Sequence, residues 1–206
     1  MSAIKKNSSI NESSSTIKKV FIVVLFFMSL LLMMPINSFT KTLHEYVNVL
    51  AKQADKSSKQ GNHSLAFTSI NKAIKLQPEN YNLYYTRAFI LARAGQYLRA
   101  IKEFSRFVKK DNYPHAIRFR ADCFMATNQL QRAANDYAMF LRVAPKDGKV
   151  WSYLAETLAL MGNSKSALDA VSRGLSTNSH WSDRLLVLQK QILSGQRIIP
   201  HKPLSN

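Results

Sequence analysis

The chain has 206 residues, enough for one domain of ordinary size with a tail or an anchor. Its apolar fraction of 46% excludes wholesale disorder, and its six glycines and six prolines are too few for most β-sandwiches and barrels, so helix is favoured. The 29 Lys and Arg against 12 Asp and Glu give a formal charge of +17, which favours an anionic partner without choosing among nucleic acid, lipid, polysaccharide and acidic protein. A single cysteine, Cys123, excludes an internal disulfide.

The amino end combines a polar basic segment, residues 1–19, with an apolar segment, residues 20–39. The apolar run has Ser29 as its only polar member before Pro35 ends it. At about 1.5 Å per residue, this core covers about 22 Å, short of the roughly 30 Å of a bilayer. Continuation to residue 39 brings the segment close to a full span, so we expect one N-terminal hydrophobic helix.

This segment has two main interpretations. A basic region, a short apolar region and a small residue such as Ser38 describe a cleaved signal peptide. An uncleaved anchor would keep its lysines inside while the rest is exported. We favour the anchor because Ile36-Asn37-Ser38 is a poor cleavage site; a buried core helix is disfavoured because the run has no polar face. Both main interpretations predict that the chain beyond residue 40 is exported across a membrane.

The remainder of the chain repeats with a period near 34 residues. Glycine or asparagine turns are expected at four places, with spacings of 34, 33 and 34: Gly61, Gly95, Asn128 and Gly162. An alanine lies seven residues before each turn and another five after it: Ala54, Ala88, Ala121, Ala155, then Ala66, Ala100, Ala133 and Ala167. Nine residues after each turn stands a large apolar residue: Ile70, Phe104, Tyr137 and Val171. This period indicates stacked helix-turn-helix units.

The pattern resembles the tetratricopeptide repeat family over about residues 44–194. The resemblance implies an all-α, right-handed solenoid of about four helix-turn-helix repeats. The alanines would lie where the two helices of a unit cross, because only small side chains allow two backbones to approach closely. Residues 182–194 are expected to form a capping helix with a polar outer face, since nothing stacks beyond it. Residues 195–206 are expected to form a flexible tail.

The resemblance also implies a concave groove, lined by the first helix of each repeat, that binds a peptide or helix of a partner protein. The groove residues predicted to bind the partner are Tyr85, Phe89, Arg93, His115, Arg118 and Asp122. In the fourth repeat the corresponding positions are Lys149, Ser152, Glu156 and Ala159. Some family members clamp a terminal carboxylate, but Asp55 and Phe89 stand where that clamp uses asparagine, which argues against it here.

A second candidate surface is basic. Arg99, Lys102, Arg106 and Lys109 recur at helical spacing, opposite the predicted buried side of their helix. Residues 81–149 contain 13 Lys and Arg and 5 Asp and Glu, a net charge of 13 − 5 = +8. Such a stripe is either an ordinary solvated face or a contact for an acidic surface, most simply an anionic membrane.

Signals for catalysis, metal or cofactor binding are weak. The five histidines have no metal-ligand spacing, and Cys123 lies on an apolar run typical of a packed core. No Gly-rich phosphate loop follows Gly95 or Gly162. We therefore predict no catalytic residue, no metal and no cofactor.

The leading hypothesis is a non-enzymatic scaffold that holds a partner segment in its groove and helps to assemble an envelope complex. It would be anchored in a membrane, in a bacterial inner membrane facing the periplasm, or else secreted or periplasmic after signal cleavage. The alternative is a module that binds an anionic lipid, glycan or other acidic polymer through the basic face. An enzyme is a third and weaker hypothesis. Nucleic acid is disfavoured, because export would remove the protein from it and no nucleic-acid motif is present.

Overall fold

The computed structural model describes residues 22–25, 36–108 and 113–201; for residues 36–39 it describes the backbone alone. Two compact units divide the chain, Met1–Asn48 and Val49–Asn206. In the first unit, residues 22–25 are helical with exposed side chains, and helix α2 begins at Ile36. Within the described ranges, no helix is both long and apolar enough to cross a bilayer. Residues 1–19 and much of the apolar segment lie outside those ranges, so the anchor or signal peptide stays a prediction.

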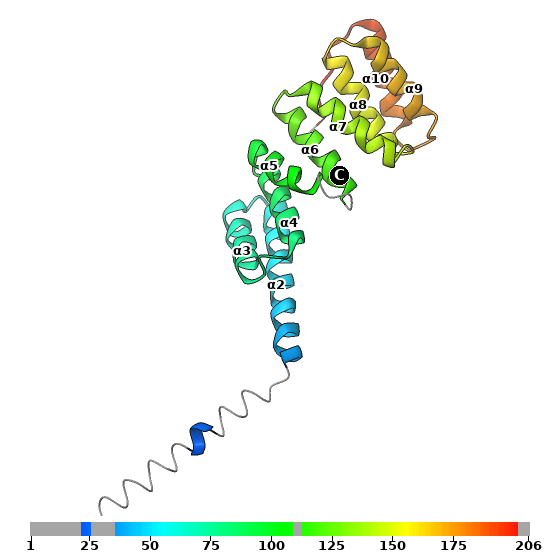
Figure 1. Ribbon diagram of the computed structural model, residues 1–206. Helices are drawn as coiled ribbons and strands as arrows, with labels where there is room; N and C mark the ends of the chain where they lie inside the picture. The colour runs from blue at the N-terminus through cyan, green and yellow to red at the C-terminus, as the bar shows by residue number, and fades with distance from the viewer. Residues whose placement is uncertain (1–21, 26–35, 109–112, 202–206) are drawn as a thin grey trace, which may run out of the picture. The chain divides into compact units, whose positions relative to one another are not determined.

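The part of the chain that the structure describes contains helices and connecting segments, with no strand (Figure 1). The helices are α2 (Ile36–Lys59), α3 (His63–Leu76), α4 (Tyr81–Arg93), α5 (Tyr97–Val108), α6 (Pro114–Ala126), α7 (Leu130–Val143), α8 (Gly148–Leu160), α9 (Ser164–Leu175) and α10 (Ser182–Ser194). From α3 onward each helix packs on the next one, and α10 also packs on α8. This confirms the predicted all-α array of stacked helix-turn-helix units.

The four predicted turns share one backbone geometry. Each turn residue has a positive φ: 80° at Gly61, 72° at Gly95, 55° at Asn128 and 78° at Gly162. The residue after each turn donates its N–H to the carbonyl five residues before it, as Gln96 does to Leu91 at 2.8 Å. Glycine adopts this left-handed conformation without steric cost, and asparagine is the residue that replaces it most readily. The turn positions predicted from the spacing are therefore confirmed.

The alanines predicted at the helix crossings are confirmed as core residues. All eight are fully buried: Ala54, Ala66, Ala88, Ala100, Ala121, Ala133, Ala155 and Ala167. The large residues nine positions after the turns are fully buried as well: Ile70, Phe104, Tyr137 and Val171. One hairpin cannot bury its apolar face alone, so this repeating set forms a continuous core only when the hairpins stack.

The last helix continues the repeat register. Gly195 follows Gly162 by 33 residues, has a φ of 68°, and is followed by the same type of hydrogen bond, from the Gln196 N–H to the Gln191 carbonyl at 3.0 Å. Helix α10, whose bounds agree with the predicted capping helix, thus occupies the first-helix position of a fifth repeat. The expected polar outer face was wrong in part, because Leu186, Val187 and Leu193 are exposed on this helix.

Candidate functional site

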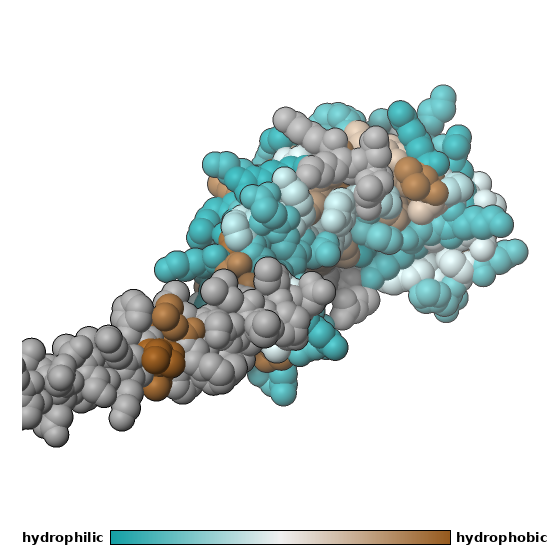
Figure 2. All heavy atoms as spheres, turned by 60° about the horizontal axis from the view of Figure 1, so that its bottom comes forward, coloured by the Kyte–Doolittle hydropathy of each residue, from teal (hydrophilic) through white to brown (hydrophobic). Residues whose placement is uncertain are grey.

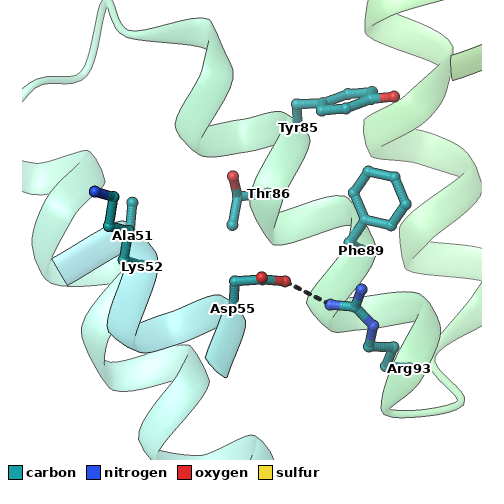
Figure 3. Close-up of a pocket in the computed structure, with 7 residues that line it drawn as sticks. All are labelled: Ala51, Lys52, Asp55, Tyr85, Thr86, Phe89 and Arg93. Atoms are coloured by element: carbon teal, nitrogen blue, oxygen red, sulfur yellow. Dashed lines mark hydrogen bonds and ion pairs between the residues drawn. The ribbon is translucent and has the colours of Figure 1, made fainter. Parts of the chain in front are cut away.

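Two candidate sites lie in the repeats: an open pocket, called the first pocket, and the buried surroundings of His201 among α6, α7 and α8, called the second pocket. The first pocket has a volume of about 350 Å³ and lies between α2 and α4 (Figure 3). Its lining residues are Ala51, Lys52, Asp55, Tyr85, Thr86, Phe89 and Arg93. Three residues that the sequence predicted for the groove, Tyr85, Phe89 and Arg93, therefore lie together on one side of it.

The apolar wall of the first pocket is an aromatic cluster. The rings of Tyr85 and Phe89 meet edge to face with centroids 5.1 Å apart. Phe89 packs in the same way against Phe104 at 5.4 Å and Phe119 at 4.4 Å. Burial raises the pKa of Tyr85 to about 12, so its hydroxyl stays protonated and neutral. Aromatic rings held in such edge contacts form a rigid apolar surface.

The rim of the first pocket is charged. Arg93 Nη1 donates to Asp55 Oδ1 at 2.8 Å, drawn as the dashed line in Figure 3, and the guanidinium also lies 5.7 Å from the centre of the Phe89 ring. Lys59 Nζ reaches the other oxygen, Asp55 Oδ2, at 2.8 Å. Burial alone would raise the pKa of Asp55, but the hydrogen bonds and charges of Lys59 and Arg93 outweigh it and lower the pKa. The rim thus holds an ionised carboxylate shared by two cations.

The other three predicted groove residues have separate surroundings. His115 is exposed, with its ring centroid 5.5 Å from that of Phe140. The Arg118 guanidinium lies 4.0 Å from the centre of the Phe119 ring. Asp122 is only 1% exposed, so it belongs to the interior side of a second pocket rather than to an open surface.

The second pocket is occupied by the chain's own tail. The backbone N–H of His201 donates to Glu156 Oε1 at 2.7 Å, and His201 Nδ1 lies 2.8 Å from the same oxygen. His201 Nε2 lies 3.2 Å from the Tyr137 hydroxyl and 3.6 Å from Asp122 Oδ1. The His201 ring stacks on Tyr153 with centroids 3.7 Å apart and an angle of 4° between the ring planes. The imidazole is therefore held on its face and at both nitrogens.

Sequence reasoning did not find this site. We expected residues 195–206 to be a flexible tail, yet the His201 side chain is only 4% exposed, which is not the environment of a loose end. Tyr137 and Tyr153 are buried, and the sequence had suggested only packing for Tyr137. A usable signal was present: Asp55, Asp122 and Glu156 each lie six residues before a turn, a row of acidic groups in a basic chain.

The predicted basic face is only partly a free cationic surface. Lys102 is exposed, and exposed Arg99 donates to Gln96 Oε1. Arg106 lies 3.2 Å from Glu103, which offsets part of its charge. Lys109 lies outside the described residues. On the face shown in Figure 2 the described surface is mainly hydrophilic, with separate apolar patches.

The described residues offer little for catalysis. Cys123 is fully buried, and burial followed by the nearby charge of Asp122 raises the pKa of its thiol. Only a thiolate is an effective nucleophile, so this thiol stays inert near neutral pH. Within the described ranges, no group of three or more His, Cys, Asp or Glu side chains is placed to hold a metal ion.

Comparison with known proteins identifies the repeat. Residues 70–102 match the tetratricopeptide repeat family model. The mouse DnaJ homolog subfamily C member 7 is 34% identical over 94 residues, which is 42% of this chain. The chain spans only 19% of the length of that relative and of its human counterpart, which is 33% identical.

Solved structures share the fold at low sequence identity. A tetratricopeptide repeat protein from Parabacteroides merdae has a TM-score of 0.63 at 16% identity, covering 73% of this chain and 61% of its own. A MamA fragment from Desulfovibrio magneticus has a TM-score of 0.59 at 16% identity, over 64% of this chain and 75% of its own. TTC0263 from Thermus thermophilus has a TM-score of 0.56 at 14% identity, over 72% and 82%. One stretch of the chain thus matches a tetratricopeptide repeat, and the described residues have the fold of a tetratricopeptide-like helical-repeat array.

Proposed function

We propose that this chain is a non-enzymatic scaffold that binds a segment of a partner protein, extended or helical, along the groove formed by the first helices. The observation that carries the proposal is the open first pocket, with an aromatic wall of Tyr85 and Phe89 and a rim formed by Asp55 and Arg93. Concave apolar sites with a few fixed polar groups are the usual form of a binding site.

The pocket favours one kind of contact. An apolar side chain of the partner would lie against Phe89 and Tyr85, which are already ordered by their neighbours and lose little freedom on binding. Arg93 retains donors beyond its bond to Asp55 and can bind a carboxylate or carbonyl of the partner. Buried aromatic and arginine anchors contribute much of the energy of protein interfaces.

Selection from a displayed peptide library tests the proposal. Peptides selected on the wild-type chain should bind at least about tenfold more weakly to Thr86→Trp, because the indole fills the pocket. Thr68→Trp is the matched control: Thr68 makes the same type of hydrogen bond, to the carbonyl four residues before it, but is exposed on α3. Equal loss in both variants, or no loss in either, would reject the first pocket as the binding site.

The alternative function is binding of an anionic polymer or membrane through the basic face. It is supported by the exposure of Arg99 and Lys102 on α5. Reversal of both charges, Arg99→Glu with Lys102→Glu, should leave peptide binding unchanged if the groove is the functional surface. If the double variant instead loses binding to vesicles that contain phosphatidylglycerol, while peptide binding persists, the basic face is the functional surface.

The proposal includes a location. We propose that the segment of residues 20–39 anchors the chain in a bacterial inner membrane, that the repeats are exported, and that they help to assemble an envelope complex. Support comes from the basic residues that precede a fifteen-residue run with a single polar member. Sequencing the amino terminus of the mature protein tests the anchor: a chain that begins at Phe39 would show that a signal peptide is removed.

A further inference from the structure

The carboxyl end of the described chain lies in the second pocket as a ligand would. Gly195, in the left-handed conformation, ends α10 and turns the chain back. Beyond it residues 196–201 are not helical, Ile198 packs against the core, and the His201 N–H reaches Glu156 at 2.7 Å. A non-helical segment anchored by one apolar side chain, one backbone hydrogen bond and one buried ring is bound in the manner of an extended peptide.

The hydrogen bonds assign the charge of the bound ring. The Tyr137 hydroxyl donates its proton to Asp122 Oδ1 at 2.7 Å, so its oxygen is left to accept from His201 Nε2–H at 3.2 Å. His201 Nδ1 faces Glu156 Oε1, which is acceptor-only, at 2.8 Å. Both ring nitrogens therefore donate, and an imidazole that donates from both nitrogens is the imidazolium cation.

The pocket needs a cation. Asp122 is 1% exposed and Glu156 is fully buried, and Arg184 Nη2 of α10 pairs with Glu156 Oε2. Among the described residues, the second oxygen of Asp122 has no hydrogen-bond partner. Removal of the imidazolium would leave buried carboxylates with less countercharge, which is strongly unfavourable. A replacement ligand must therefore also bring a positive charge.

The shape of the pocket restricts that cation further. Tyr153 presents a flat face at stacking distance, parallel to the ring of His201 within 4°. The tetrahedral ammonium group of lysine cannot stack on this face. The acceptors, Glu156 Oε1 and the Tyr137 oxygen, each lie within 3.2 Å of one nitrogen of a single five-membered ring. This spacing fits an imidazolium.

We propose that the pocket formed by Asp122, Tyr137, Tyr153 and Glu156 is a binding site for a histidine side chain of a partner segment, and that His201 occupies it as an internal competitor. The inference rests on the proposed function, since it names the chemistry of the partner at the second pocket of the same groove. A partner binds by displacing the tail and supplying its own imidazolium to the two carboxylates.

Displacement has a measurable consequence. A segment joined to its own site by a short linker has an effective concentration on the order of 1 mM. A free peptide that binds the vacant pocket with a Kd of about 50 µM would therefore bind the self-occupied pocket about twentyfold more weakly. Removal of the internal histidine should restore that affinity.

The test uses the full chain and two labelled synthetic peptides. One peptide has the sequence of residues 196–206, and the other replaces its histidine with alanine. Fluorescence anisotropy should show that the first peptide binds His201→Ala at least about tenfold more tightly than it binds the wild-type chain. The alanine peptide should bind His201→Ala at least about tenfold more weakly than the first peptide does.

Each other result overturns the inference. Equal binding of the first peptide to both chains, no binding to His201→Ala, or equal binding of the two peptides would show that the pocket does not select histidine. If the wild-type chain sediments as an oligomer and His201→Ala as a monomer, the tail of one copy binds the second pocket of another copy instead. The Thr86→Trp variant changes only the first pocket, and the His201→Ala variant changes only the second. Failure of the proposed function and failure of the histidine site are therefore distinguishable.

Discussion

Arg120 of α6 and Asp136 of α7 join the two helices of the third repeat through two parallel hydrogen bonds, Nε to Oδ2 and Nη2 to Oδ1, both 2.7 Å long. The side chains are only 16% and 6% exposed. They lie eight residues before and eight after the turn at Asn128. The pair therefore belongs to the repeat, and neighbouring repeats show what can replace it.

The same two positions hold Arg87 and Glu103 in the second repeat, 2.6 Å apart. In the fourth repeat they hold Leu154 and Ala170, both buried. The fold thus accepts either an ion pair or an apolar pair at this crossing. What it should not accept is one charge without its partner.

Asp136→Ala should lower the free energy of unfolding by about 3 kcal/mol, because it leaves the Arg120 guanidinium largely buried without a carboxylate. The double variant Arg120→Leu with Asp136→Ala copies the fourth repeat and should lie within about 1 kcal/mol of wild type. Urea denaturation followed by circular dichroism measures both. A double variant as unstable as the single one would mean that the ion pair itself is required.

Ala88→Leu should overpack the crossing of α4 and α5. Ala88 is fully buried, and its methyl group leaves no space for a longer side chain where the backbones approach. The expected loss in the free energy of unfolding is about 1–3 kcal/mol. Ala126→Leu is the control, because Ala126 is exposed at the end of α6. Equal effects of the two substitutions would contradict the close crossing.

Docking of the tail should depend on pH. Burial alone would lower the pKa of His201, but hydrogen bonds to Asp122 and Glu156 and the charges of both outweigh burial and raise the pKa. The titratable groups that face His201 include Asp122 of α6, Tyr137 of α7, and Tyr153 and Glu156 of α8. Two cations lie beyond them: Arg184 of α10, paired with Glu156, and Lys149 of α8, whose Nζ lies 5.8 Å from the centre of the Tyr153 ring. The pKa of Tyr137 is itself raised by burial and by Asp122, so that hydroxyl stays protonated.

The raised pKa of His201 decides how the stability of the docked tail changes with pH. The stabilisation is fully present below the unfolded pKa of about 6.5 and is lost as pH rises through the higher folded value. NMR titration should give His201 a pKa above the ordinary value of about 6.5. The protection of the tail amides, residues 197–201, relative to their intrinsic exchange rates should fall at high pH. Glu156→Gln should bring the pKa of His201 down. A His201 that titrates at or below about 6.5 would contradict the docked tail.

The thiol of Cys123 should not react with thiol reagents in the folded chain. Burial raises its pKa, so at about pH 8 the thiol is protonated and out of contact with solvent. Ellman's reagent should react with it only after urea unfolds the chain. Reaction of the folded chain at the rate of a free thiol would contradict the packing assigned to this residue.

The sequence by itself determined the repeat. Each hairpin needs one tight turn and one close crossing of its two helices. The same residue types therefore recur at the turns, Gly61, Gly95, Asn128 and Gly162, and at the alanines around them. The same register placed Tyr85, Phe89 and Arg93 on one face, and the structure brings them into one pocket.

Only the tertiary structure decided what fills the second pocket. His201 and Glu156 are 45 residues apart in the chain, and no period relates them. The aromatic and acidic groups that hold the ring come from three different helices, so the site exists only after the hairpins stack. Two buried carboxylates are then stabilised by a nearby positive charge. Sequence periodicity cannot predict this, because the effect arises from desolvation in the packed state.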